Sequence, residues 1–355
     1  MPRRSRRPSR TQAALFAQLI AELTPQVQRA FTASVTDLQA NVNWPALLSA
    51  LTLMNTEAAI AALNISPAAW SEYSSAMTAA YAKAGASTAA QIKQMGVGDI
   101  GVRFNMSNPR AEQWIRENVA DLVVNFTQEQ IATARTVIEA GYAQGQGPRN
   151  IAVDLAGRAT GGTARTGGVL GLDQPRAYRL QAVTQGMRSA EGVRGLVVAH
   201  QDGSVSVRYR VNKATAQRII RAYHAGAEVP QSERIISERQ YSNALLKDRA
   251  DTIAETETAS AVMSARDEEW RQLTESQGLT ESAIIKTWRH NRGSRDGRPE
   301  HIAMNGTSVR GLKTAFALPD GTLMQYPHDP AGGARHNIRC ACSADYRLDH
   351  SAGLT

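Results

Sequence analysis

Apolar residues recur every three or four positions through residues 11–146, which is the spacing of one face of an α-helix. In AALFAQLIAEL this spacing aligns Leu15, Leu19 and Leu23, and Pro25 is expected to break or kink that helix. Similar stripes follow at 43–64, 66–95, 108–126 and 127–145. Because each stripe needs an apolar partner, we expect these helices to pack on one another or on neighbouring subunits.

The pattern changes after Gly147. Residues 157–175 are rich in glycine and arginine, which predicts a loop or flexible arm. These glycines do not form a phosphate-binding loop, since no Gly-Lys-Ser/Thr follows them. Two β-branched runs joined by Gln-Asp-Gly-Ser predict a β-hairpin at 196–211, and helical spacing resumes at 213–227 and 245–273.

One acidic residue interrupts the apolar face of the last of these helices. Glu257 falls on the same face as the apolar residues Leu246, Ala250, Ile253, Ala254 and Ala261. A carboxylate in that position is costly unless it is paired or hydrogen-bonded. No second inward carboxylate follows at helical spacing, so we predict a structural role for Glu257 rather than a catalytic one.

The segment from about 280 to 350 is rich in Gly, Pro, Arg and His, with a Pro-Asp-Gly turn that predicts a short hairpin. It has too few apolar residues for a large core, so we expect an interaction other than apolar packing to stabilise it. The whole pattern predicts a mainly α fold with an extended helical body, one central β-hairpin and a small α+β C-terminal module. The predicted segments are a basic disordered tail at 1–12, a helical domain at 13–147, a central helical domain at 148–278 and a His/Cys module at 279–355.

Composition agrees with a helical protein that has an acidic partner. Aromatic residues are only 5% of the 355 residues, and the formal net charge is +8. No apolar run reaches the length of about 18 residues that spans a membrane, so we expect a soluble protein of cytosolic origin with no membrane partner. The positive charge is densest at the start of the chain, in Arg3, Arg4, Arg6, Arg7 and Arg10. We predict that these residues form a mobile tail. The tail either contacts phosphates or an acidic protein surface, or only aids solubility.

The only two cysteines, Cys340 and Cys342, follow His336 closely in the segment that also holds His301. Zinc prefers cysteine sulfur and histidine nitrogen in a tetrahedral set, so His301, His336, Cys340 and Cys342 are candidate Zn²⁺ ligands. Their spacing matches no common zinc finger. The alternatives are two reduced buried thiols or a strained disulfide.

Two enzymatic interpretations compete with a structural one. The pairs His290-Asn291 and His336-Asn337 occur near the cysteines, as in HNH-type metal-dependent nucleases, where a histidine activates water beside a metal. The paired CxxC motifs that often brace such nucleases are absent. A Cys-His nucleophile pair lacks an identifiable orienting partner. We therefore favour a non-enzymatic protein and keep a metal-dependent nuclease or processing enzyme as the alternative.

Three motifs, in order, resemble the phage Mu F-like minor head proteins, which are related to the SPP1 gp7-type head-morphogenesis group. The terminal motif matches at Trp288, Asp296, Arg298, His301, Gly306, Phe316, Pro327, Asp329, Cys340 and Cys342. The upstream motifs match at Gly167, Gly168, Gly171, Leu172, Arg249, Ala250, Ile253, Ala254, Thr256 and Glu257. Arg339, Ala341 and Glu255 depart from the family pattern, which puts any chemistry of the replaced side chains in doubt.

The resemblance covers about residues 125–345 and implies a minor capsid protein of a tailed phage or prophage. It implies head assembly near the portal, with the portal protein, the major capsid protein, scaffold and packaged DNA as partners, and a role in DNA packaging or delivery. The expected location is the virion head, and the host cytoplasm during assembly. The expected structural residues of the terminal module are Trp288, Asp296, Arg298, Gly306 and Phe316, and the resemblance agrees with a structural Glu257.

Overall fold

The computed structural model describes residues 11–97, 102–291 and 297–349. Within them the protein is mainly helical with a few short antiparallel strand pairs, which confirms the predicted fold class. None of the described helices is long and apolar enough to cross a membrane.

The chain folds into two compact units that are discontinuous in sequence. The first unit takes the described residues of 1–30, 73–121 and 251–355, and the second takes 31–72 and 122–250. This division differs from the consecutive segments expected from the sequence. Long helices cause the difference, because α1 (Gln12–Ala40) and α11 (Gln231–Ser276) each contribute residues to both units.

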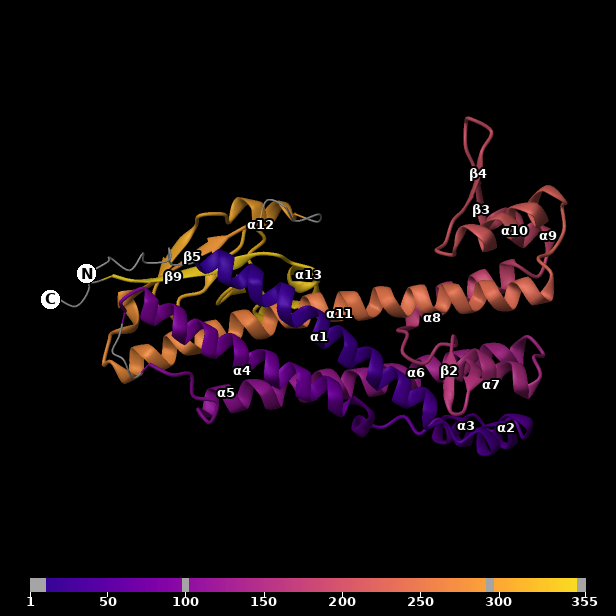
Figure 1. The fold of residues 1–355 in the computed structure, drawn as a ribbon, viewed down its shortest axis with the longest axis horizontal. Coiled ribbons are helices and arrows are strands. Elements are labelled where there is room, and N and C mark those ends of the chain that lie inside the picture. Colours follow the sequence, from indigo (N-terminus) through magenta and orange to yellow (C-terminus); the bar gives the residue numbers. More distant parts are fainter. Residues whose placement is uncertain (1–10, 98–101, 292–296, 350–355) are drawn as a thin grey trace, which may run out of the picture. The chain divides into compact units, whose positions relative to one another are not determined.

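Helices surround one apolar core in the second unit. Besides parts of α1, α11 and α6 (Ala120–Ala143), this unit contains α2 (Trp44–Thr52), α3 (Thr56–Ala62), η1 (Pro67–Trp70), α7 (Pro148–Ala156), α8 (Gln174–Gly186), α9 (Ala190–Gly195) and α10 (Lys213–His224) (Figure 1). Its core includes Leu47, Ile138, Leu155, Leu172 and Ile219. Several helices begin where an Asn or Asp side chain accepts a hydrogen bond from the first turn, at Asn43, Asn55, Asp173 and Asn212.

Two hairpins belong to the second unit. Strands β3 (Val197–Ala199) and β4 (Val205–Val207) pair antiparallel, which confirms the predicted central hairpin. The glycine-rich arm is not a simple loop. Its strands β1 (Arg158–Gly161) and β2 (Ala164–Thr166) pair, and the Val169 backbone N–H then donates to the Asp154 and Leu155 carbonyls at 2.9 and 3.0 Å. These bonds fasten the arm to α7.

The first unit combines helices with the terminal sheet. It contains most of α4 (Ser71–Gln94), then α5 (Pro109–Trp114), the π-helical turn η2 (Ile115–Val119) and the second part of α11. Strand β5 (Ile284–Arg289) lies between β6 (Ser308–Arg310) and β9 (Ser343–Leu348), and β7 (Phe316–Ala317) pairs with β8 (Leu323–Met324). The short helical elements η3 (Glu281–Ala283), α12 (Pro299–Ala303), η4 (Pro330–Gly332) and α13 (Gly333–Asn337) connect them (Figure 1).

A small core holds the terminal module together and includes both cysteines. Trp288, Phe316 and Met324 are fully buried and pack with Cys340 and Cys342. On the same face of the sheet, two residues along β9 from the partner of Trp288, Tyr346 stacks on Trp270 of α11 with ring centroids 5.8 Å apart. The Tyr346 hydroxyl also donates to Asp267 at 2.9 Å. The module is therefore anchored to α11 rather than folded on its own apolar residues alone.

Helix α1 continues through Pro25, so the proline does not break it, and a break was one of the two outcomes expected from the sequence. Proline removes one backbone N–H from the helix ladder. Leu23, Val27 and Phe31, on the buried face of this helix, are each at most 4% exposed. Their burial on both sides of the proline stabilises a continuous helix despite the lost hydrogen bond.

Candidate metal centre

Three potential metal ligands converge in the first unit. His301 lies on α12, while Cys340 and Cys342 lie between α13 and β9. Their ligand atoms all fall within 4.8 Å of one another, and the three residues are 2%, 8% and 2% exposed. Both cysteines are free thiols. The group could hold a metal ion, as the sequence predicted for these three residues.

The local backbone explains how the thiols come to face one point. Arg339 adopts a positive φ of 52°, and the Cys340 N–H donates to the Asn337 carbonyl at 3.1 Å, so the chain turns sharply after α13. The Cys342 N–H then donates to Cys340 Sγ at 3.4 Å, which folds the second cysteine back beside the first. Arg298, just before α12, donates to the Ile338 carbonyl at 2.6 Å and fastens the two segments together.

The separations of these atoms fit a tetrahedral zinc site. His301 Nδ1 lies 3.4 Å from Cys340 Sγ and 3.6 Å from Cys342 Sγ. Zinc bonds of about 2.3 Å to sulfur and about 2.0 Å to nitrogen, at tetrahedral angles, place the two ligand atoms about 3.6 Å apart. The side chains therefore need little movement to receive Zn²⁺.

A further histidine approaches the same thiols, and the sequence did not identify it as a ligand. His290 Nδ1 lies 3.6 Å from Cys342 Sγ, the separation expected between two zinc ligands. Strand pairing brings it there, because Arg289 of β5 lies opposite Ser343 of β9 and the next residues along that register are His290 and Cys342. The only sequence signal was its position at the end of a β-like run.

His336 occupies a different position from the one predicted. Its Nδ1 lies 3.1 Å from His301 Nε2, and its Nε2 lies 3.0 Å from the Asp320 carboxylate. It therefore contacts His301 rather than either thiol, and it lies outside the converging group. A metal on His301 Nδ1 would leave the proton on His301 Nε2. The chain His301–His336–Asp320 can then orient the ligand ring.

This chain predicts an effect of His336 on metal affinity. Replacing His336 by Ala should weaken Zn²⁺ binding by about 10–100-fold, since outer partners orient a ligating histidine and raise its basicity. Competition with a chromogenic chelator measures the affinity. Arg335→Ala is the matched control, because the exposed Arg335 also contacts Asp320 but touches neither histidine. Equal affinities for His336→Ala and the parent chain would contradict the orienting role.

The two thiols differ in acidity. A hydrogen bond from the Cys342 side chain lowers the pKa of Cys340 well below its usual range, helped by His328 and His301. The same hydrogen bond, together with burial, raises the pKa of Cys342. The pair thus favours one thiolate, on Cys340, before any metal arrives. Thiolate is the form that binds zinc.

The predicted structural residues surround this group. The Trp288 ring meets His301 and Phe316 edge to face, each with ring centroids 5.4 Å apart. Gly306 adopts a φ of 89° and donates its N–H to the Trp288 carbonyl at 2.9 Å, a conformation that L residues rarely adopt. Asp296 and the tail residues Arg3, Arg4, Arg6, Arg7 and Arg10 lie outside the described residues.

Glu257 lies on α11 and is partly buried near His328 and Tyr73. No ion pair or hydrogen bond within the described ranges joins its carboxylate to an arginine. Burial raises its pKa from 4.5 to about 7, although His328 opposes the shift. The residue therefore carries a desolvated carboxyl group.

The shift predicts that Glu257 destabilises the fold at alkaline pH. The folded chain holds a proton that the unfolded chain has already lost, so its contribution to stability falls as pH rises from about 4.5 to about 7. Glu257→Gln should raise the free energy of unfolding at pH 8 by up to about 3 kcal/mol, and by almost nothing near pH 4. Urea titrations at both pH values measure the difference. Glu255→Gln, an exposed neighbour, should show no such pH dependence.

Comparison with known proteins assigns no family. No protein-family model, no curated protein and no solved structure matches the chain. Any functional assignment therefore depends on the motif residues and on the geometry of the site.

Proposed function

We propose that this chain is a non-enzymatic minor capsid protein of a tailed phage or prophage, with a terminal module braced by Zn²⁺. The observation that carries the zinc assignment is the convergence of His301, Cys340 and Cys342 in a buried cluster at tetrahedral separations. Two sulfurs and an imidazole nitrogen are the ligand types that zinc prefers.

His290 is the proposed fourth ligand, since its Nδ1 lies 3.6 Å from Cys342 Sγ. It lies outside the group whose ligand atoms all fall within 4.8 Å of one another, so its ring would have to move closer when the metal binds. A zinc ion with four protein ligands keeps no open position for water or substrate, which is typical of structural sites. The ligands come from the end of β5, from α12 and from the segment before β9. One ion would thus join segments up to 52 residues apart, in a module with a small apolar core.

The phage assignment is supported by the resemblance of the motifs. Trp288, Phe316, Cys340 and Cys342 match the terminal motif, and the same four residues pack in one core. On this proposal the protein acts in head assembly near the portal, in contact with portal and major capsid protein, and resides in the virion after assembly in the host cytoplasm. Contact with scaffold or packaged DNA is assigned to the basic tail.

One experiment tests both halves of the proposal. A tagged chain is purified from an infected lysate, associated proteins are identified, and zinc is counted by native mass spectrometry. We expect one zinc per chain, together with portal and major head proteins. A chain that carries no zinc contradicts the brace, and a chain recovered without head proteins contradicts the capsid assignment. Zinc-dependent DNA cleavage that His290→Ala abolishes without unfolding the module would favour the nuclease instead.

A further inference from the structure

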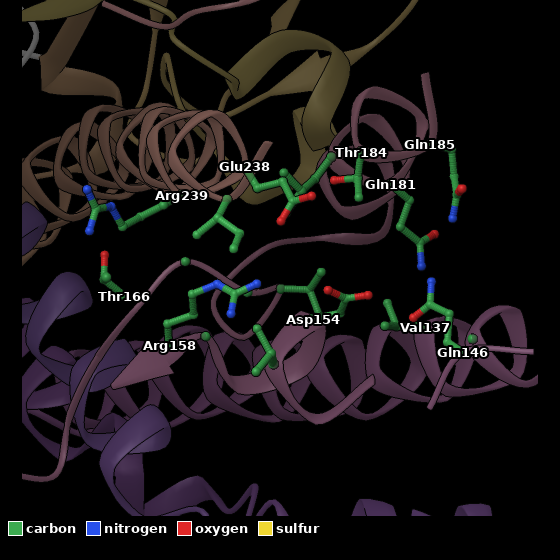
Figure 2. Close-up of a pocket in the computed structure, with 18 of the residues that line it drawn as sticks. Val137, Gln146, Asp154, Arg158, Thr166, Gln181, Thr184, Gln185, Glu238 and Arg239 are labelled. Carbon is green, nitrogen blue, oxygen red and sulfur yellow. The ribbon is translucent and has the colours of Figure 1, made fainter. Parts of the chain in front are cut away.

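A hollow lies inside the second unit, away from the metal centre. Helices α6, α7, α8 and α11 and the β1–β2 hairpin line a narrow cavity of about 50 Å³ (Figure 2). Each of the four helices contributes an apolar side chain to the lining, namely Val137, Val153, Leu180 and Ile235. A more polar hollow adjoins it, and the two share the side chains of Asp154, Arg158, Ile235 and Glu238.

Opposite charges meet where the two hollows join. Figure 2 shows the carboxyl groups of Asp154 on α7 and Glu238 on α11 turned into the space between these helices, with the Arg158 guanidinium beside them. Arg188 lines the outer, polar hollow. Throughout the second unit, which the structure describes completely, no side-chain hydrogen bond or ion pair within 4.0 Å engages any of these four residues. Other charged groups of this unit do pair, as Arg176 does with Asp173 and Asp248.

The two carboxyl groups are held in an unfavourable environment. Burial raises the pKa of Asp154 to about 6, and Arg188 opposes the shift. Burial and the nearby Asp154 raise the pKa of Glu238 to about 7. A desolvated carboxylate that lacks a hydrogen-bond donor costs free energy, which a positively charged donor in the hollow would recover.

Glycines allow a close backbone contact just before Arg158. A Cβ on Gly168 would lie 2.4 Å from the Gly157 nitrogen, and one on Gly157 would lie 2.6 Å from the Gly167 carbonyl oxygen. The backbone segments on either side of the hairpin therefore touch directly, and Arg158 follows this contact immediately. Gly167 and Gly168, which match a motif of the family named above, thus let the backbone after β2 pack closely against the backbone at the end of α7, beside the hollow.

We infer that this hollow binds a free α-amino acid with an unbranched apolar side chain. The ammonium group would donate to Asp154 and Glu238, and the carboxylate would accept from Arg158, with Arg188 at the rim. The aliphatic chain would lie against Val153, Leu180 and Ile235. Apolar walls with a few convergent polar groups are typical of small-molecule sites. A zwitterion matches both unpaired signs of charge, whereas a simple amine or a simple acid would leave one of them unpaired.

Three compounds of matched length test the inference on the full-length chain. Norleucine carries both charged groups, hexylamine lacks the carboxylate, and hexanoate lacks the ammonium group. Isothermal titration calorimetry at pH 8 should show norleucine binding about tenfold or more tightly than either analogue, because each loses charge-assisted hydrogen bonds. Equal affinity for hexylamine and norleucine would overturn the inference. So would the absence of norleucine binding at millimolar concentrations.

Variants locate the site. Glu238→Gln and Arg158→Gln should each weaken norleucine binding about tenfold, since each removes one charged partner. Glu233→Gln, on the same helix but outside the hollow, is the matched control and should bind as the parent chain does. Unchanged affinity in both site variants would overturn the location. If a variant fails to fold, the three-compound comparison on the parent chain still decides the outcome. The result is independent of the zinc proposal.

Discussion

If Zn²⁺ braces the terminal module as proposed, replacing Cys342 by Ser should abolish zinc binding and unfold that module. The side chains are similar in size, so packing changes little, but a ligand is lost from a site that is 2% exposed at this residue. Structural zinc contributes about 10–16 kcal/mol to the folding of small zinc peptides. A whole domain is commonly stable by only about 5–15 kcal/mol. The small core around Trp288 should therefore not persist without the metal.

Two measurements check this result. Native mass spectrometry should show one zinc in the parent chain and none in Cys342→Ser. Limited proteolysis should then cut the variant within residues 284–348 and spare the second unit. Chelation of the parent chain should reproduce the same cuts. Ala341→Ser, which alters the residue between the two cysteines, is the control and should retain zinc. A Cys342→Ser chain that keeps both its metal and its protection would contradict the brace.

Arg249→Met should destabilise the second unit by about 1–3 kcal/mol, the cost expected when a buried carbonyl loses its hydrogen-bond donor. Arg249 is 3% exposed and donates to the Gly171 carbonyl at 2.8 Å. It also pairs with Glu129, and its guanidinium lies 5.6 Å from the ring centres of both Phe31 and Phe126. Methionine would preserve much of the packing but leave the carbonyl and the Glu129 carboxylate without their donor.

Urea unfolding followed by far-UV circular dichroism measures this loss. The control is Arg135→Met, in the same unit, which breaks an exposed pair with Glu57. Exposed pairs contribute little because water and salt screen them. We therefore expect the Arg135 variant to unfold at nearly the parent midpoint. Equal destabilisation by the two substitutions would show that burial of Arg249 does not matter.

The sequence predicts helices well here because their apolar spacing is regular, and it correctly predicts the hairpin at β3 and β4. It predicts the helix through Arg266, Asp267, Glu268 and Glu269 but not their burial, although all four are at most 6% exposed. A run of four charged residues ordinarily indicates a solvated surface. Partners distant in sequence make the burial possible, such as Tyr346 for Asp267 and Arg110 for Glu268.

The metal ligands show the same limit. The residue types alone identify His301, Cys340 and Cys342 as ligands, because Cys-x-Cys and a nearby histidine suit zinc. They favour His336, four residues before Cys340, over His290, which lies 50 residues before it. The structure distinguishes them in two ways. Strand register brings His290, which follows Arg289, beside Cys342, which precedes Ser343. Helices α12 and α13 bring His336 Nδ1 to 3.1 Å from His301 Nε2, so His336 contacts His301 instead of a thiol.

Segments of the two units alternate along the sequence. This alternation limits where the chain can be cut and the order in which the units can fold during synthesis. The second unit spans 31–72 and 122–250, so all of its residues precede the last of the three segments that form the first unit. During synthesis, the first unit therefore cannot fold completely until residues 251–349 have been made. Until then, α1 and α4 lack this last segment of their own unit. No single cut yields an intact unit. Excision of the metal-binding module would consequently expose apolar faces of α1 and α4, and a carrier or assembly partner would be needed to protect them.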